Sequence, residues 1–234
     1  MATALFTQTD FVEVDVASVG VELQSREPLA LLHSEWEQVL PIWIGELEAS
    51  AIAQALQGVD FPRPLTHDLL VSVMGTLDGT LEEVRVTELR GGTYIGVLVV
   101  RTPDGVHEID TRPSDGLALA VRTNARILVA RNLLEEAPDL DFIAAAGGEP
   151  VIRYRGVTLG PGAEVLHVTA EVERRDLRRG DRITAVRDRA IDNPIAFLEI
   201  ALDQSSSFPV DRVRDGEVET ILLPAPRQPG RIGP

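Results

Sequence analysis

Two segments of the chain place the same residue types at the start of a predicted apolar helix. They are Arg63–Asp68 (RPLTHD) and Arg112–Asp115 (RPSD), and each brings an arginine, a hydroxyl and an aspartate together. Helix N-termini and arginine side chains attract phosphate, whereas aspartates repel it unless a divalent cation bridges them. If both helix starts face one cleft, these residues form a candidate site for phosphodiester hydrolysis.

The residue types suggest a role for each member of this site. His67 is the natural proton-transfer group, and Arg63 or Arg112 would stabilise charge on a transferring phosphoryl group. Carboxylate oxygens are the ligands that Mg²⁺ or Mn²⁺ prefers, and the expected metal ligands are Glu48, Asp68, Asp110 and Asp115. The expected catalytic residues are Arg63, His67, Asp68, Arg112, Ser114 and Asp115.

Each helix start also has a purely structural interpretation. Ser, Thr and Asp cap helices, Pro favours the first helical turn, and Asp complements the helix dipole. Taken singly, these preferences explain either motif without any chemistry. The other histidines, which are His33, His107 and His167, lack the spacing of a metal site and are interpreted as structural or surface residues.

The composition excludes several kinds of site. The 234 residues include no cysteine, and all 22 basic residues are arginine. Disulfides, zinc thiolates, a cysteine nucleophile, a phosphate-loop lysine and a Schiff base are therefore excluded. No apolar run reaches the ~20 residues that cross a bilayer, and no basic segment opens a secretory signal. We expect a cytoplasmic protein that does not contact membranes.

Negative charge is concentrated in the first part of the chain. Residues 1–145 contain 9 arginines and 23 acids, a net charge of −14, whereas residues 146–234 contain 13 arginines and 14 acids, a net charge of −1. A field of this sign repels a phosphate backbone. To act on nucleic acid, such a protein needs a divalent metal or a local arginine cluster.

Hydrophobic periodicity predicts the elements that position the candidate residues, and their mixture indicates an α+β protein. Gly91-Gly92 and Pro103-Asp104-Gly105 are predicted hairpin turns. The predicted strands are 11–23, 29–32, 39–44, 81–89, 93–101, 105–110, 127–130, 151–154, 165–168, 208–213 and 218–223, and the main helices are 46–57, a segment from Thr66, 113–122 and 194–202.

Three segments resemble the bifunctional nuclease (BFN) domain family, in the family's order and spacing. They are Leu40–Gly45 continuing to Glu48, then Arg63–Asp68, then Ile109–Ala120. The resemblance covers about residues 10–140 and implies a compact domain with a mixed β-sheet and three main helices, self-association, and DNase and RNase activity. The motif positions that it carries over are Glu48, Arg63, Thr66, His67, Asp68, Asp110, Arg112, Ser114 and Asp115. Gly116 departs from the alanine that is usual in the family.

The second part resembles a reduced PDZ domain of the bacterial type, in Leu177–Val186 and in Arg212–Ile221. This resemblance implies a small β-rich accessory domain that could pair with a protein or peptide partner by strand addition. The expected organisation is a bifunctional-nuclease-like domain at 1–143, a linker at 144–150, a PDZ-like domain at 151–226 and a disordered tail at 227–234.

Two functions remain open at this point. The first is a nuclease that depends on Mg²⁺ or Mn²⁺, hydrolyses DNA or RNA, forms a homo-oligomer and carries a PDZ-like accessory domain. The alternative is a non-catalytic oligomeric binding or scaffold protein, in which both helix-start motifs are structural caps. The negative field favours the alternative, and the family resemblance together with the doubled Arg/hydroxyl/Asp pattern favours the nuclease.

Overall fold

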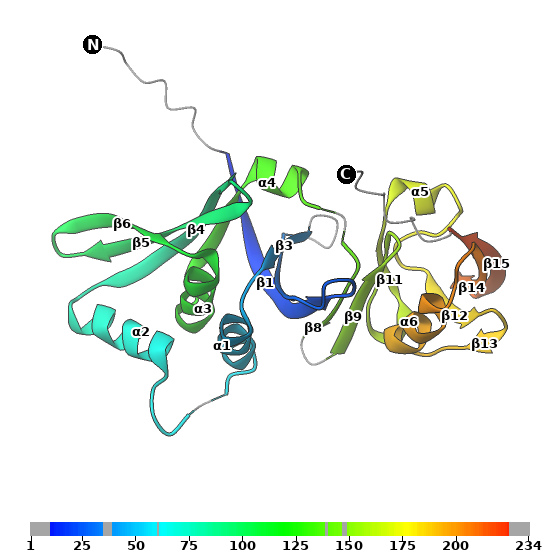
Figure 1. The fold of residues 1–234 in the computed structure, drawn as a ribbon, viewed down its shortest axis with the longest axis horizontal. Coiled ribbons are helices and arrows are strands. Elements are labelled where there is room, and N and C mark those ends of the chain that lie inside the picture. Colours follow the sequence, from blue (N-terminus) through cyan, green and yellow to red (C-terminus); the bar gives the residue numbers. More distant parts are fainter. Residues whose placement is uncertain (1–9, 35–38, 60, 139, 147–148, 225–234) are drawn as a thin grey trace, which may run out of the picture. The chain divides into compact units, whose positions relative to one another are not determined.

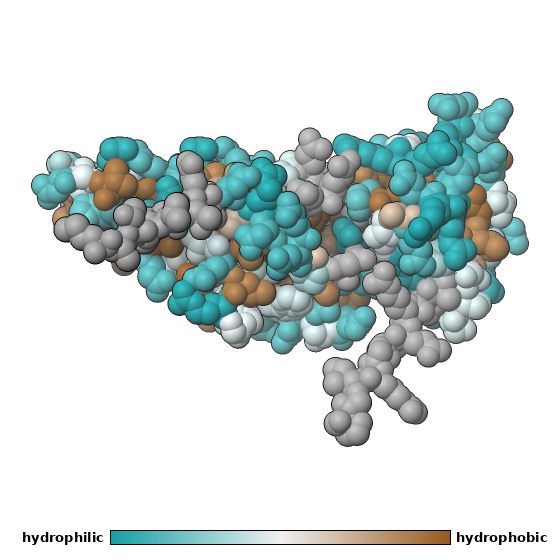
Figure 2. Space-filling model, turned by 90° about the horizontal axis from the view of Figure 1, so that it is seen from above, coloured by the Kyte–Doolittle hydropathy of each residue, from teal (hydrophilic) through white to brown (hydrophobic). Residues whose placement is uncertain are grey.

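The computed structural model describes residues 10–34, 39–59, 61–138, 140–146 and 149–224, so the predicted tail at 227–234 lies outside the described residues. The chain divides into two compact units. The N-terminal unit holds residues 1–19 and 27–138, and the C-terminal unit holds residues 20–26 and 139–234. No helix in the described ranges is long and apolar enough to cross a membrane. On the face shown in Figure 2, most of the surface is hydrophilic, with separate apolar patches.

The N-terminal unit is built on a mixed sheet with the strand order β1-β7-β4-β5-β6. Strands β4 and β7 are parallel, whereas β1–β7, β4–β5 and β5–β6 are antiparallel. A hairpin of β2 and β3 joins the sheet through β1. The bounds are β1 Phe11–Glu22, β2 Pro28–His33, β3 Val39–Trp43, β4 Thr80–Arg90, β5 Thr93–Thr102, β6 Gly105–Thr111 and β7 Arg126–Ala130.

The turn between β4 and β5 shows how the sequence determines one connection. Arg90 pairs with Thr93, so only Gly91 and Gly92 lie in the turn, and their φ angles are 59° and 82°. A two-residue turn with two positive φ angles matches the twist of antiparallel strands, and glycine adopts it without steric cost. The Gly-Gly pair therefore fixes the register of the hairpin.

Three main helices lie together on one side of this sheet, with α3 between α1 and α2 (Figure 1). Helix α3 contacts the sheet and both neighbouring helices, and its residues Leu117–Ala120 are almost completely buried. Helix α2, in contrast, buries none of its residues. The bounds are α1 Glu46–Leu56, α2 Thr66–Thr76, α3 Pro113–Thr123 and a short α4 Arg131–Glu135.

Gly116 is the point of closest approach between α3 and the sheet. A Cβ at this position would lie 2.7 Å from Cγ1 of Val84 on β4 and 3.4 Å from Leu98 on β5. The glycine that departs from the family's usual alanine thus allows α3 to lie close to these two strands. The first turn of α3, which holds the candidate residues, is positioned by this contact.

The C-terminal unit contains two antiparallel sheets. In one, β8 to β11 follow in chain order, and the last residues of β1 pair with β8. The other is a smaller sheet with the order β13-β12-β14-β15, and α6 packs against β9 and β12. The bounds are β8 Phe142–Ala146, β9 Glu149–Tyr154, β10 Val157–Leu159, β11 Val165–Val168, α5 Ala170–Glu173, β12 Arg182–Val186, β13 Arg189–Ala190, α6 Pro194–Leu202, β14 Phe208–Arg214 and β15 Glu217–Leu223.

The structure differs from the sequence prediction at the expected linker, 144–150. Ala144–Ala146 end β8, Glu149 and Pro150 begin β9, and Ala145 pairs with Pro150. Residues 147 and 148 lie outside the described ranges. Alanine, glycine and proline suggested a linker, but Phe142 and Ala144 are buried on alternate positions and anchor a strand.

Replacing Gly116 with alanine tests the close packing of α3 on β4. Overpacking by the added methyl group should cost about 1–3 kcal/mol of stability, and the higher helix propensity of alanine should offset up to about 1 kcal/mol of this cost. We therefore expect Gly116→Ala to lower the free energy of unfolding by about 1 kcal/mol. Because the clash is with Val84, Val84→Ala in the same chain should relieve it. Urea unfolding of the four proteins of this double-mutant cycle measures the coupling, and a coupling energy near zero would contradict the packing argument.

Candidate functional site

The starts of α2 and α3 meet in the N-terminal unit. His67, the second residue of α2, places Nε2 3.4 Å from Oδ1 of Asp115, the third residue of α3. The two side chains are 15% and 31% exposed, so the pair is partly shielded but reachable from solvent. The structure therefore brings together the histidine of one predicted motif and the aspartate of the other.

Arg112 ties this pair to the first helix. Its Nε and Nη2 donate to Oδ2 and Oδ1 of Asp115 at 2.7 and 3.0 Å. Its Nη1 lies 2.8 Å from Oε1 of Glu48 on α1. Because two parallel N–H···O bonds fix the relative orientation of a guanidinium and a carboxylate, Asp115 is held in one position. We call Glu48, His67, Arg112 and Asp115 the helix-start cluster.

Asp115 is ionised in this cluster. Its partial burial acts to raise the pKa of the carboxyl, but the hydrogen bonds and charge of Arg112, helped by His67, outweigh burial and hold the pKa below its ordinary value. The same contacts with Asp115 and Glu48 raise the pKa of Arg112. The side chain of Arg112 is 65% exposed, so a permanent positive charge is presented to solvent beside the histidine.

Asp68 takes part in a different network. Its Oδ1 accepts from Nε of Arg122 at 2.6 Å, and its Oδ2 accepts from the backbone N–H of Leu65 at 2.8 Å. Arg122 also donates to the carbonyls of Ala51 and Ala118, so it joins α1, α2 and α3. The hydrogen bonds from Arg122 and from Leu65 hold the pKa of Asp68 below its usual range. Asp68 caps its helix and anchors three helices to one another.

The capping bond of the structural interpretation forms in only one of the two motifs. Residue Leu65 is the N-cap of α2, and Asp68 reaches back to its N–H. Residue Arg112 is the N-cap of α3, and Asp115 turns to the Arg112 side chain and to His67, although Pro113 and Asp115 still occupy the first turn as the structural interpretation expects. Asp115 therefore contacts a histidine and an exposed arginine, whereas Asp68 contacts an arginine that is only 11% exposed and its own helix start.

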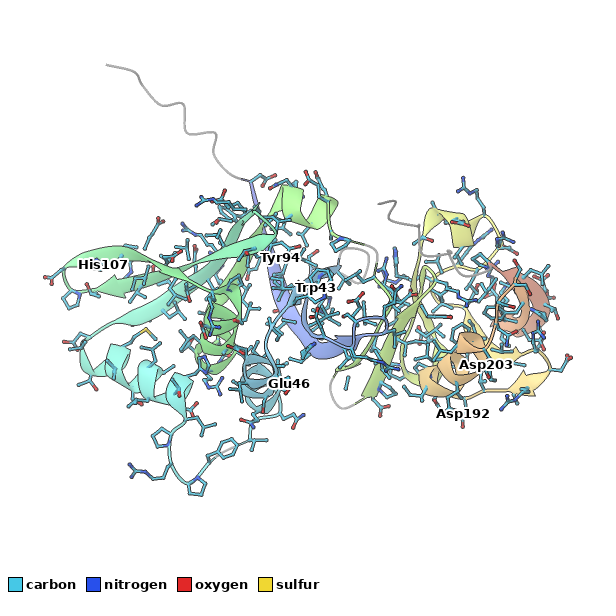
Figure 3. The ribbon with its side chains drawn as sticks, viewed as in Figure 1. Trp43, Glu46, Tyr94, His107, Asp192 and Asp203 are labelled. Carbon is cyan, nitrogen blue, oxygen red and sulfur yellow. The ribbon has the colours of Figure 1, made fainter. Side chains whose placement is uncertain are left out.

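Three other predicted residues lie outside these contacts. Arg63 is exposed in the loop before α2, and Asp110 is exposed on β6. Ser114 is the second residue of α3 and is buried. Within the described ranges, no hydrogen bond of the helix-start cluster reaches any of these three side chains. His107 bonds to Thr102 near the tip of the β5–β6 hairpin, well away from Trp43 and Glu46 (Figure 3).

Of the four predicted metal ligands, the fold brings Glu48 and Asp115 to one place. Both direct carboxylate oxygens at Arg112, whose guanidinium lies between them. Their oxygen chemistry fits a hard divalent cation, although Arg112 is the cation that they share in this structure. In the part of the chain that the structure describes, no group of three or more His, Asp or Glu side chains is arranged to hold a metal ion.

A cavity of about 810 Å³ adjoins the cluster, and Arg112 and Ser114 form part of its wall. Trp43 at the end of β3 and Tyr94 at the start of β5 line it as well, and Figure 3 labels both, with Glu46 below them. Trp43 is 40% exposed. Burial raises the pKa of the Tyr94 phenol. The cavity thus combines aromatic surface with the exposed arginine of the cluster.

Sequence reasoning missed the importance of Arg122 and of the two aromatic residues. Arg122 lies seven residues after Asp115, which is two turns along the same face of α3, and this spacing was a usable signal. Trp43 lies within the segment Leu40–Gly45 and ends β3, but nothing local connects it with Tyr94. Those two residues line one cavity only because of the tertiary fold.

The contribution of Asp68 to stability should depend on pH in a defined direction. Because its folded-state pKa lies below 3.8, its stabilisation is present above pH 3.8 and is lost as the pH falls through the folded-state value. An asparagine at this position can still accept a hydrogen bond from the backbone N–H of Leu65, but it lacks the negative charge that pairs with Arg122. With solvent screening of a partly exposed pair, we expect Asp68→Asn to cost up to about 1 kcal/mol at pH 7 and less at pH 3.

Urea unfolding at both pH values measures this difference, with Asp104→Asn in the exposed β5–β6 turn as the control. An equal loss at pH 7 and pH 3 would show that the charge of Asp68 is not what stabilises the helices.

The comparisons with known proteins show the family to which the chain belongs. The sequence pattern described as the bifunctional nuclease domain matches residues 30–139, which include every residue of the helix-start cluster. Two uncharacterized proteins of Mycobacterium tuberculosis, from strains CDC 1551 / Oshkosh and ATCC 25618 / H37Rv, are each 40% identical to this chain over 126 residues. The match covers 53% of this chain and 75% of each relative. The chain therefore belongs to the bifunctional nuclease domain family.

Proposed function

We propose that this protein is a nuclease that hydrolyses phosphodiester bonds of DNA or RNA at the helix-start cluster. The observation that carries the proposal is the contact between His67 and Asp115, which are 48 residues apart in the sequence and begin separate helices. A proton-transfer group, an orienting carboxylate and an exposed arginine in one place are the parts that phosphoryl chemistry requires. Membership of the bifunctional nuclease domain family supports the same function.

Each residue of the cluster has a role in this reaction. Asp115, held ionised by Arg112, orients the imidazole through Nε2 of His67. The other ring nitrogen, Nδ1, accepts a proton from the attacking water and later returns it to the leaving oxygen. Arg112 stabilises the negative charge that develops on the phosphoryl oxygens. Arg122 and Asp68 hold the three helices in register and do not touch the substrate.

We include Mg²⁺ or Mn²⁺ in the proposal, with Glu48 and Asp115 as the residues that would hold it. Their carboxylates already converge on one cation, the guanidinium of Arg112. A bound divalent ion would neutralise phosphate charge and polarise the scissile bond. The strongly acidic composition of residues 1–145 is a further reason to expect that such an ion assists binding of the substrate.

The cavity next to the cluster is suited to an unpaired base. Trp43 and Tyr94 provide aromatic surface, and stacking of a base on such a side chain contributes about 1–3 kcal/mol. A base in this cavity would place its own phosphate near Arg112, which lines the same wall. A base within a duplex is already stacked on its neighbours, so we propose that single strands are the preferred substrate.

Cleavage by highly purified full-length protein tests the catalytic proposal. We expect single-stranded DNA and RNA to be cut with Mn²⁺ or Mg²⁺ and not with EDTA. Asp115→Asn should lower the rate about 10²–10⁴-fold, because general acid–base catalysis contributes on that scale and the imidazole loses its charged partner. Asp104→Asn, in an exposed turn, is the matched control and should cleave like the natural protein. Equal rates for Asp115→Asn and Asp104→Asn would refute the assignment of the site.

One observation favours self-association, which both candidate functions include. Helix α2 exposes Leu69, Leu70, Val73 and Leu77, which are 55%, 41%, 44% and 70% exposed. A contiguous apolar surface on a helix is commonly covered by another chain. We therefore propose that α2 is the contact between copies in a homo-oligomer. A non-catalytic oligomeric scaffold remains the second candidate, and it is distinguished from the nuclease by the cleavage experiment.

The oligomer can be tested by light scattering at tens of micromolar. Leu69→Glu with Val73→Glu should shift the natural protein from an oligomer to a monomer, because two buried charges would oppose the contact. Leu222→Glu, which alters an exposed leucine of β15, should leave the mass unchanged. A natural protein that is strictly monomeric under these conditions would contradict the proposal.

We propose a PDZ-like accessory role for the C-terminal unit, within a cytoplasmic protein. Strand β15 is an edge of the small sheet, and its Val218 and Leu222 are exposed. An exposed sheet edge can accept a strand from a peptide or protein partner. Among the described residues, the whole helix-start cluster belongs to the N-terminal unit, which supports catalysis without residues from the C-terminal unit.

A further inference from the structure

The C-terminal unit has a groove whose charged lining is mostly arginine. The groove encloses about 590 Å³, and Arg178, Arg179, Arg182 and Arg214 line it. Thr184 and Gly180 add a hydroxyl and a backbone segment to the same wall. No aromatic side chain is among its lining residues. The groove is therefore suited to charge recognition and not to stacking.

The aspartates near these arginines differ in exposure. Asp181 is 2% exposed and accepts from Nε and Nη2 of Arg214 at 2.7 and 2.8 Å. Burial acts to raise the pKa of Asp181, but Arg214 and the N–H of Arg178 outweigh burial and keep it ionised. Asp176 is 47% exposed and pairs with Arg178, Arg212 and Arg214, and Asp215 is an exposed residue of the groove lining. The charge of Asp181 is thus neutralised inside the unit, and four arginines still outnumber two aspartates in the lining.

Three arginines of the groove lining are exposed to solvent. Arg178 is 62% exposed and pairs with Asp176 at 3.1 Å, and Arg179 and Arg182 are also exposed. Within residues 174–189 there are seven arginines and three aspartates, a net charge of +4 in a chain whose total is −15. All seven arginines of this segment are exposed, and they are Arg174, Arg175, Arg178, Arg179, Arg182, Arg187 and Arg189. This is a concentrated positive surface on an otherwise acidic protein.

We propose that this groove binds the phosphate backbone of a nucleic acid strand, so that the C-terminal unit supplies substrate affinity that the acidic N-terminal unit lacks. The proposal rests on the nuclease function proposed above. Guanidinium groups match phosphate oxygens in geometry and remain charged at any physiological pH. A lining without aromatic residues predicts contacts to backbone phosphates and little preference for base sequence. Because residues 1–145 repel a nucleic acid, a separate cationic surface would add affinity to that supplied by a divalent ion at the helix-start cluster.

Binding and cleavage can be separated by measuring affinity without metal. The probe is a fluorescent single-stranded DNA with phosphorothioate linkages, added to the full-length protein in EDTA and followed by anisotropy at several salt concentrations. Arg179→Gln with Arg182→Gln should weaken binding at least 10-fold. It should also reduce the slope of log affinity against log salt by about 1.4, since each lost phosphate contact on a single strand contributes about 0.7.

A matched control makes the same change in charge at two residues outside the groove. Arg187→Gln with Arg189→Gln removes two exposed arginines of the same unit that do not line the groove, and affinity should stay within about threefold. Equal losses from both pairs, or no loss from either, would overturn the proposal. Arg178 and Arg214 are left intact because they contact Asp176 and Asp181, and circular dichroism checks that each double variant is folded.

Two further binding measurements show which proposal fails if the results differ from those expected. A fluorescent polyglutamate peptide that binds the groove while the DNA does not would assign the groove to an acidic protein and refute the nucleic acid proposal. Asp115→Asn should bind the DNA like the natural protein, since Asp115 lies outside the groove. If the DNA binds the groove but Asp115→Asn cleaves normally, the catalytic assignment fails while the groove stands.

Discussion

The packing of α3 against β4 and β5 is the constraint on which the candidate site depends. Leu117–Ala120 are buried there, and Gly116 lets the helix backbone approach Val84 closely. The same helix carries Arg112 and Asp115 at its start and Arg122 two turns later. Because one rigid, buried helix holds both networks, the cluster and its anchor are fixed together, and α1 and α2 are positioned through their ion pairs with it.

Two aspartates in similar local sequences make different contacts in the fold. Asp68 and Asp115 each follow an arginine, a proline and a hydroxyl residue at a helix start. Asp68 meets Arg122, whose side chain is 11% exposed, and caps its own helix. Asp115 meets Arg112, whose side chain is 65% exposed, together with His67. Exposure of the arginine partner decides whether the pair anchors helices or can meet a substrate.

Much of the fold could be predicted from the sequence, because local signals coincide with the elements. Periodicity and turn residues placed β1 to β7 and α1 to α3 to within about one residue of their observed bounds. The strand β8 was missed because its alanines resemble a linker, and it is stabilised by pairing with β1 and β9. For the candidate site, the sequence could predict the types of residue but not how they pair. Which arginine pairs with which aspartate depends on tertiary contacts over 54 residues for Arg122 and Asp68, and no local pattern carries that information.

Net charge computed from a sequence gives a poor account of the surface that a partner meets. Residues 146–234 are almost neutral in total, yet Arg212 and Asp181 are 4% and 2% exposed, whereas seven exposed arginines lie within residues 174–189. The N-terminal unit has fewer arginines than acidic residues. Two of these arginines, Arg85 and Arg126, pair with the same carboxylate, Glu83 on β4, so negative side chains outnumber positive ones on this unit. The ion pairs that form in the folded protein therefore determine whether an accessible surface is positively or negatively charged. A chain can be strongly acidic as a whole and still present one cationic groove to a polyanion.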